Sequence, residues 1–165
     1  MNKLIEIKHW HLLVLILFPG IVINLLDLND FWLWFGTIWY CIIYNSWLFS
    51  IGNVVCKTNA NSLFEIFLFK ISFIYPFICF AVVIYKQFSD PNSFPYWLVP
   101  FQILLISSEF YFMYFVSKNL VNFEKKHGVE TSNIFSTFCA FWFFPIGIFF
   151  VQPRVNQLKQ VYQNR

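Results

Sequence analysis

The sequence predicts an all-α membrane protein with four transmembrane helices plus a C-terminal re-entrant or fifth hydrophobic segment. Three observations predict this class. Of the 165 residues, 59% are hydrophobic. Only 12% are charged, about half of the roughly 25% that soluble domains carry. The apolar residues also fall into long stretches separated by short polar ones. We therefore expect residues 1–165 to form a single integral membrane helical bundle.

The first four apolar stretches are each long enough to cross a bilayer, because about 20 apolar residues span its hydrocarbon core. A span surrounded by lipid must satisfy its own backbone hydrogen bonds, which favours helices. The alternating pattern typical of an outer-membrane β-strand is absent from the sequence. The expected spans are residues 10–28, 31–55, 63–85 and 97–117.

The first stretch begins like a secretory signal peptide, since Lys3 and Lys8 precede an apolar run. No small-residue cleavage site follows, and the run resumes after Pro19. This pattern favours an uncleaved first span over a removed signal.

The last apolar stretch, residues 134–151, contains a helix-breaking triplet that begins at Pro145 and ends at Gly147. Proline removes a backbone donor, and glycine permits a tight turn. We therefore favour a re-entrant or interfacial segment that enters the membrane and returns. A full fifth crossing is the alternative.

The loop charges predict the orientation, because cytoplasmic loops of membrane proteins carry an excess of lysine and arginine. With the N-terminus in the cytoplasm and residues 134–151 re-entrant, Lys86 is the only basic residue outside. A full fifth crossing would place Arg154 outside, against the rule. The prediction is a multi-pass protein of the bacterial inner (cytoplasmic) membrane. Its basic residues Lys118, Lys125, Lys126 and Arg154 would face cytoplasmic lipid or a partner protein.

Glu109 lies near the middle of the fourth span, where a carboxylate is costly and usually faces a bundle interior or a partner. At 1.5 Å rise per residue it lies roughly 12 Å from the cytoplasmic end of its span, and Lys70 lies roughly 10 Å from that end of the third. The matching depth predicts a buried Lys70–Glu109 pair.

Other polar residues fall close to this level and predict one intramembrane polar cluster around Glu109. They are Asn45 and Ser46 in the second span and Ser108 in the fourth. Such a cluster can fix helix register through interhelical hydrogen bonds. It can also form an ion or proton path, or a substrate site. Glu65 and Glu124, near span ends, are expected to be solvated.

Catalytic and metal-binding motifs are missing from the sequence, which favours a protein that is not an enzyme. The common hydrolase, metalloprotease and nucleotide-binding patterns are absent. The four cysteines are scattered and are interpreted as buried thiols. We expect no cofactor and no metal. Direct nucleic-acid binding is not expected either, because the net charge of +3 is small and dispersed.

Small residues are scarce in the spans, and no GxxxG pattern occurs. Close backbone packing is therefore disfavoured, and interlocking aromatic side chains are expected to hold the helices together. The wide apolar faces of such helices can meet lipid or other copies, so a homo-oligomer is expected.

Residues 141–156 read FWFFPIGIFFVQPRVN. This segment resembles a C-terminal signature, roughly WFFPIGIWFIQPRIN, of small uncharacterised bacterial multi-span membrane proteins. Phe149 stands where the signature has Trp. The resemblance implies that the Pro-Ile-Gly break and the Gln-Pro-Arg exit are designed features. In size and span number alone, the chain is also similar to membrane accessory proteins encoded beside RNA-guided CRISPR nucleases and to small membrane effectors of phage defence.

The sequence thus favours a non-enzymatic, oligomeric membrane protein that acts as a membrane effector, pore or accessory subunit. Its expected partners are the lipid bilayer, copies of itself and a cytoplasmic protein. The alternative is a small ion or proton channel or carrier that uses the intramembrane Glu109/Lys70 pair.

Overall fold

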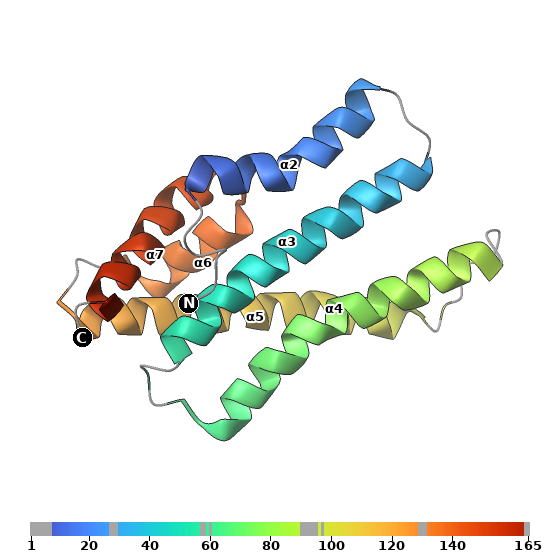
Figure 1. Cartoon of the computed structure of the whole chain (residues 1–165). Coiled ribbons are helices and arrows are strands. Elements are labelled where there is room, and N and C mark those ends of the chain that lie inside the picture. Colours follow the sequence, from blue (N-terminus) through green and yellow to red (C-terminus); the bar gives the residue numbers. More distant parts are fainter. Residues whose placement is uncertain are drawn as a thin grey trace.

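The computed structural model describes residues 8–26, 30–56, 59, 61–89, 96, 98–128 and 132–163. Within these ranges the chain is all helical and contains no strand, which confirms the predicted class. Lys3, Lys57 and most of the loop 86–96, on which the predicted orientation depends, lie outside them. In chain order the helices are α2 (His9–Leu25), α3 (Asp30–Cys56), α4 (Leu63–Ser89), α5 (Leu98–Lys126), α6 (Ile134–Trp142) and α7 (Ile148–Gln163) (Figure 1).

Three of these helices are long and apolar enough to cross a membrane, which makes the chain a membrane-associated protein. Their apolar segments are Phe35–Cys56 in α3, Leu63–Lys86 in α4 and Leu98–Lys126 in α5. Helix α2 is apolar but has only 17 residues, fewer than the roughly 20 that span the hydrocarbon core. Four spans were predicted from the sequence, and length and composition support three.

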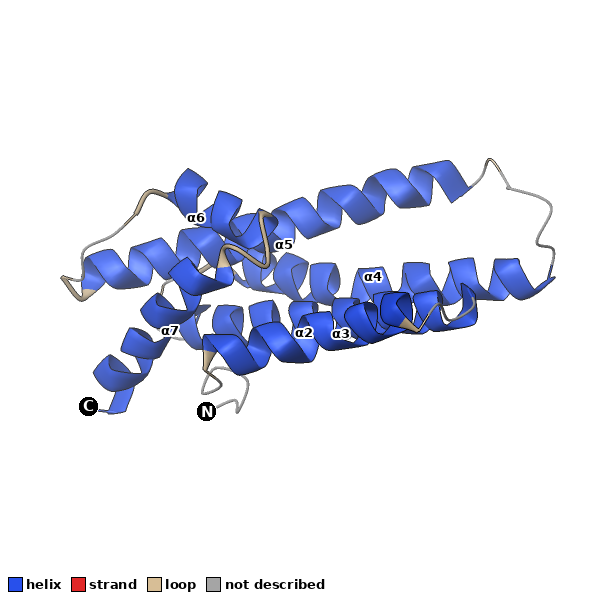
Figure 2. Cartoon of the chain, turned by 90° about the horizontal axis from the view of Figure 1, so that it is seen from above, coloured by secondary structure: helices blue, strands red, loops and turns tan. Residues whose placement is uncertain are grey.

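Helix α3 lies at the centre of the bundle, with α2 packed along it and α5 crossing it (Figures 1 and 2). Helix α4 packs on α5. The start of α2, the end of α3, the start of α4 and the ends of α5 and α7 lie toward one end of the bundle (Figure 1). The pair α2–α3 and the pair α4–α5 diverge toward the other end. The basic residues Lys125 and Lys126 therefore lie at the end where α7 terminates.

Aromatic stacking joins α3, α4 and α5, as the scarcity of small residues predicts. The Phe69 ring of α4 is 1% exposed and stacks on Phe49, Phe112 and Phe115 at centroid distances of 5.3, 5.1 and 4.7 Å. Gly52 of α3 lies under this ring, and a Cβ added there would collide with it. The close approach of α3 to α4 therefore depends on a glycine at position 52.

Helix α5 extends nine residues beyond the span predicted to end at 117, reaching Lys126. Its 29 residues correspond to a length of about 43 Å at 1.5 Å per residue. The extension is helical because Leu120, Val121 and Phe123 are buried on its inner face. The helix is therefore longer than the hydrocarbon core of about 30 Å.

Residues 134–151 form a helical hairpin rather than one continuous helix. Helix α6 ends at Trp142, a turn occupies residues 143–147, and α7 begins at Ile148 and runs back beside α6 (Figure 1). The predicted break at Pro145 and Gly147 is thereby confirmed. Gly147 approaches the Ala140 carbonyl so closely that a Cβ at position 147 would overlap it. Only a glycine fits this crossing of the two chain segments.

Candidate functional site

The predicted intramembrane polar cluster reduces to a contact between α5 and α3. Glu109 of α5 is half-buried, and its carboxyl interacts with the side chain of Asn45 on α3. Asn45 is only 3% exposed. Its side-chain oxygen, Oδ1, is buried without a hydrogen-bond partner among the described residues. The two residues therefore form a contact in which one buried acceptor is left unsatisfied.

We call this contact the Glu109 site (Glu109 and Asn45), and the described groups in electrostatic range of its carboxyl are ordinarily uncharged. Tyr40, Cys41 and Tyr44 of α3 lie within electrostatic range of the carboxyl. The Tyr44 hydroxyl donates to the Phe141 carbonyl oxygen at 2.8 Å, and the Tyr40 and Tyr44 rings stack at 5.7 Å. The carboxyl of Glu109 is thus bordered by one amide, one thiol and two phenol groups.

Lys70 does not join the site, so the predicted Lys70–Glu109 pair is wrong. Helices α4 and α5 run antiparallel, and the Lys118 ammonium bonds the Glu65 carboxylate at 2.7 Å. This contact places Lys70 near the level of Glu109, as the depth calculation expected. However, Lys70 is exposed, whereas the preceding Phe69 is 1% exposed. Successive helical residues point about 100° apart, so burying Phe69 turns Lys70 away from α5.

Of the two serines of the predicted cluster, Ser108 bonds its own helix rather than the Glu109 site. The Ser108 hydroxyl donates to the Leu105 carbonyl of its own helix at 2.9 Å. Ser46 is half-buried, and its carbonyl accepts from the Ser50 hydroxyl at 2.7 Å. Serine hydroxyls often bond the carbonyl one turn earlier in this way. The Ser108 hydroxyl therefore satisfies the backbone rather than the carboxyl.

A second buried carboxylate, Glu124, lies at the far end of α5. Its two oxygens accept from Nε and Nη2 of Arg154 on α7, each at 2.7 Å. The guanidinium Nη1 donates to the Thr137 hydroxyl on α6 at 3.1 Å. Glu124 is 1% exposed, so the prediction that it is solvated is wrong. We call Glu124, Arg154 and Thr137 the hairpin clamp, because they join α5, α6 and α7.

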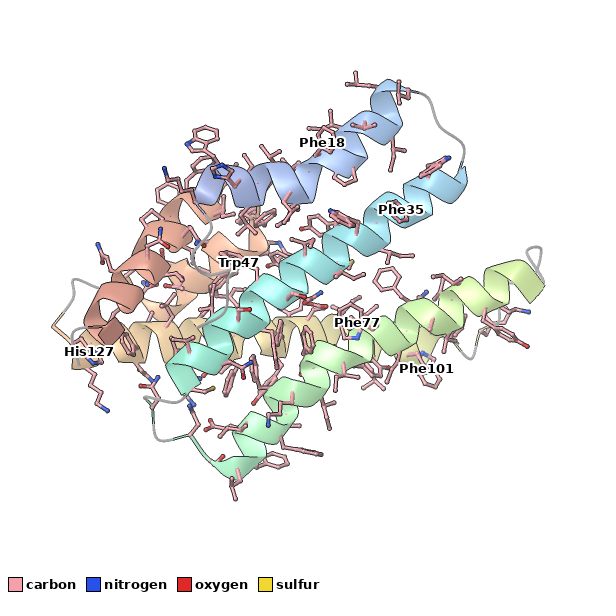
Figure 3. The ribbon with its side chains drawn as sticks, in the orientation of Figure 1. Phe18, Phe35, Trp47, Phe77, Phe101 and His127 are labelled. Carbon is pink, nitrogen blue, oxygen red and sulfur yellow. The ribbon has the colours of Figure 1, made fainter. Side chains whose placement is uncertain are left out.

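Polar contacts from α3 hold the same hairpin from the other side. Trp47 points from α3 toward α6 and α7 (Figure 3). Its indole Nε1 donates to the Gln152 side-chain oxygen at 2.9 Å, and its ring meets Phe141 edge-on at 5.7 Å. Trp47, Gln152 and Phe141 are each no more than 1% exposed. The hairpin is therefore fixed by hydrogen bonds inside an otherwise apolar bundle.

The four basic residues predicted to face the cytoplasm differ in their surroundings. Lys125 and Lys126 are exposed. Lys118 is half-buried and paired with Glu65. Arg154 is engaged in the hairpin clamp, which the sequence reasoning missed. The sequence did contain an indication of this pair, because a cation, Arg154, follows the helix break and a carboxylate, Glu124, precedes the hairpin.

Among the described residues, no three His, Cys, Asp or Glu side chains lie close enough together to hold a metal ion. The four cysteines are free thiols. No family model, curated protein or solved structure matches the chain.

Proposed function

We propose that the protein is a non-enzymatic multi-span protein of the bacterial inner membrane that assembles with copies of itself. It would act there as a membrane effector, pore or accessory subunit. The observation that carries the proposal is the exposure of the first part of α5. Between residues 99 and 107, every side chain except Leu105 is exposed in the single chain. Helix α4 contacts this segment, as the hydrogen bond from the Tyr75 hydroxyl to the Phe101 carbonyl at 3.2 Å shows. The remaining exposed faces of the segment have room for neighbouring helices as well as for lipid.

The exposed part of α5 is not purely apolar, which favours a protein neighbour on one of its faces. Gln102 is exposed there, whereas the hydroxyl of the exposed Ser107 donates to the Ile103 carbonyl of its own helix at 2.8 Å. Polar side chains on membrane helices favour helix–helix contacts, because lipid offers them no hydrogen bonds. Helix α4 adds exposed apolar side chains, including Ile71, Ile74 and Ile78. We call α4 together with residues 98–107 the α4–α5 arm and propose it as the assembly surface.

The proposed membrane arrangement keeps four crossings and a re-entrant hairpin, with both termini in the cytoplasm. Helix α2 supports it as the fourth crossing, since it runs beside α3 and ends at the opposite end of the bundle from its start (Figure 1). The hairpin clamp supports the re-entrant segment, because it brings Arg154 back to Glu124 near the end of α5. Exposed Lys125 and Lys126 would then meet anionic lipid or a cytoplasmic partner. A role in phage defence, as a CRISPR accessory or otherwise, rests on the likeness in architecture.

Cysteine crosslinking in native membranes tests the assembly surface. In a chain whose native cysteines are replaced by alanine, Ile103→Cys is compared with Ile21→Cys on α2. Both residues are exposed, at 60% and 53%, and both lie toward the same end of the bundle. We expect a short thiol crosslinker to produce dimers through position 103 and few through position 21. Equal crosslinking at the two positions, or a monomeric mass in lipid nanodiscs, would contradict the proposal.

A flux assay on the purified protein in liposomes separates the possible roles of the assembly. Release of a trapped dye or ion indicates a pore, whereas sealed vesicles with an intact oligomer indicate an accessory subunit. A vesicle-permeabilising effector would release dyes without selectivity.

The second candidate is a small ion or proton channel or carrier with Glu109 at its site. The observation that favours it is the contact of this carboxyl with a neutral amide, with Lys70 exposed on another helix face. Flux that is lost in Glu109→Gln would support this candidate. Flux that is unchanged in the same variant would contradict it and leave a simple pore.

A further inference from the structure

We infer that Glu109 and Asn45 form a proton-binding site. The neutral carboxylic acid of Glu109 donates its proton to Asn45 Oδ1, while the Asn45 amide donates back to the other carboxyl oxygen. This inference deepens the second candidate function, because it names the ligand and partner of the same carboxyl. It concerns binding, however, and does not require that the proton be transported.

Asn45 supplies a buried acceptor, Oδ1, that only the neutral form of Glu109 can satisfy. Asn45 is 3% exposed, and its Oδ1 has no partner in the described part of the chain. A buried polar atom without a hydrogen bond is costly, and native structures contain few of them. Its side chain already contacts the Glu109 carboxyl through the amide nitrogen. An ionised carboxylate can only accept hydrogen bonds, whereas a protonated one also carries an O–H donor. The neutral form of Glu109 is therefore the form that can satisfy Oδ1.

The cations of the surrounding helices are directed away from the Glu109 carboxyl. On α5, Lys118 bonds the Glu65 carboxylate at 2.7 Å. On α7, Arg154 bonds Glu124 at 2.7 Å. Lys70 of α4 reaches a similar level but is exposed on another face. An ionised Glu109 would thus lie within the membrane without a cationic partner among the described residues, which lipid penalises strongly.

Most of the titratable groups near the Glu109 carboxyl are uncharged at neutral pH. Helix α3 contributes a thiol and two phenols, all within electrostatic range and all ordinarily uncharged at neutral pH. Helix α4 brings only Lys70 to this level among its charged residues, and α6 contains one titratable residue, Cys139. The groups contributed by α3 and α6 carry no positive charge at neutral pH, and Lys70 is exposed on another face of α4. The environment of Glu109 therefore suits a neutral acid held by an amide.

A lipophilic carbodiimide tests the protonation state directly, because such reagents modify protonated carboxylic acids in apolar surroundings. The full chain is reconstituted in liposomes, treated with dicyclohexylcarbodiimide at neutral pH and mapped by peptide mass spectrometry. Glu65 and Glu124, each paired with a cation, are internal controls in the same molecule. We expect modification of Glu109 to exceed that of either control by about tenfold or more, since both control carboxylates are held in ion pairs at 2.7 Å. Modification should also fall about tenfold per pH unit once the site deprotonates.

Infrared spectra then test the role of Asn45. The carboxylic C=O band of Glu109 is identified by its loss in Glu109→Gln, which replaces the neutral acid by an amide of similar shape. In Asn45→Leu this band should shift to higher frequency, because the C=O loses the amide donor.

Two results would overturn the inference. One is a folded protein in which Glu109 reacts no more than the two paired glutamates. The other is protection of Glu109 by sodium ions at constant pH, which would assign the site to a metal cation. A proton site without flux through the protein would leave the inference standing and remove the second candidate function.

Discussion

Two glutamates of helix α5 contact partners of different charge, a cation in one case and a neutral amide in the other. Glu124, near the end of α5, is 1% exposed and accepts two hydrogen bonds from the guanidinium of Arg154. Glu109, in a more central part of α5, is half-buried and interacts with the neutral amide of Asn45. The first carboxylate is fully compensated by a planar cation, and the second is not.

This difference follows the division of the bundle into a closed end and an open end. At the closed end the hairpin of α6 and α7 covers α5, and Arg154 reaches both Glu124 and Thr137. At the open end residues 99–107 of α5 are almost all exposed. The Glu109 site lies between these regions. The comparison teaches that the hairpin clamp serves structure, whereas the unpaired acid at the margin of the packed region is available for function.

Removal of the clamp's cation should give the largest effect. Arg154→Ala leaves Glu124 buried without its partner, and breaking a buried ion pair in this way costs about 3–5 kcal/mol. We expect a loss of about 3 kcal/mol, near the lower limit of that range, because the Arg154 side chain is 19% exposed. Reversible unfolding by SDS in lipid bicelles measures the change.

Lys125→Ala is the matched control for this variant, since Lys125 is an exposed cation at the same end of the bundle. Its effect should be within about 0.5 kcal/mol, as for most surface substitutions. Equal stability of the two variants would remove the distinction between a structural and a solvated cation.

The turn of the hairpin offers a second way to break the clamp. Gly147→Ala places a Cβ against the Ala140 carbonyl, which requires α6 and α7 to separate. We expect a loss of about 1–3 kcal/mol, the usual cost of overpacking. The same bicelle unfolding assay applies, with Gly20→Ala as the control, because a Cβ at position 20 meets no atom within 4 Å. A tolerated alanine at 147 would show that the hairpin is looser than the contact implies.

A smaller effect is expected where α3 holds the hairpin. Trp47→Phe removes the indole donor to Gln152 while keeping an aromatic ring beside Phe141. The loss should be about 1 kcal/mol, typical of one net hydrogen bond. Trp39→Phe provides the comparison, since Trp39 donates to the Leu15 carbonyl from a half-buried position away from the hairpin. Thermal unfolding in detergent would show whether Trp47→Phe lowers the stability of the protein more than Trp39→Phe does.

Much of the fold is written in local patterns and could be predicted from the sequence. The apolar stretches placed the helices, and the chemistry of Pro145 and Gly147 placed the break between α6 and α7. Lys70 also lies at a level of α4 near that of Glu109 on α5, because the relative level depends only on helical rise and on the antiparallel pairing of the two helices. The face on which Lys70 points was not predicted, since the packing of Phe69 against three other rings sets it. Rotation about a helix axis is a tertiary property.

The hairpin clamp lay beyond sequence reasoning for a related reason. Glu124 and Arg154 lie 30 positions apart, and they meet only because the chain reverses at residues 143–147. A glutamate followed by two lysines is also typical of a solvated helix end. Asn45 was correctly placed near Glu109, because both lie at a comparable depth on neighbouring spans. The packing of the surrounding aromatic rings decides which of the polar residues at that depth are in contact.

The central claim is that Glu124 is held as an ion and Glu109 as a neutral acid. Glu124→Gln and Glu109→Gln make the same change at the two sites, so their unfolding free energies in bicelles test the claim most directly. Glutamine resembles a neutral carboxylic acid in shape but cannot compensate a guanidinium. We predict that Glu124→Gln loses about 3 kcal/mol or more, as expected for a cation left without its partner, and that Glu109→Gln changes stability by less than about 0.5 kcal/mol. Equal losses, or a larger loss at Glu109, would contradict the account.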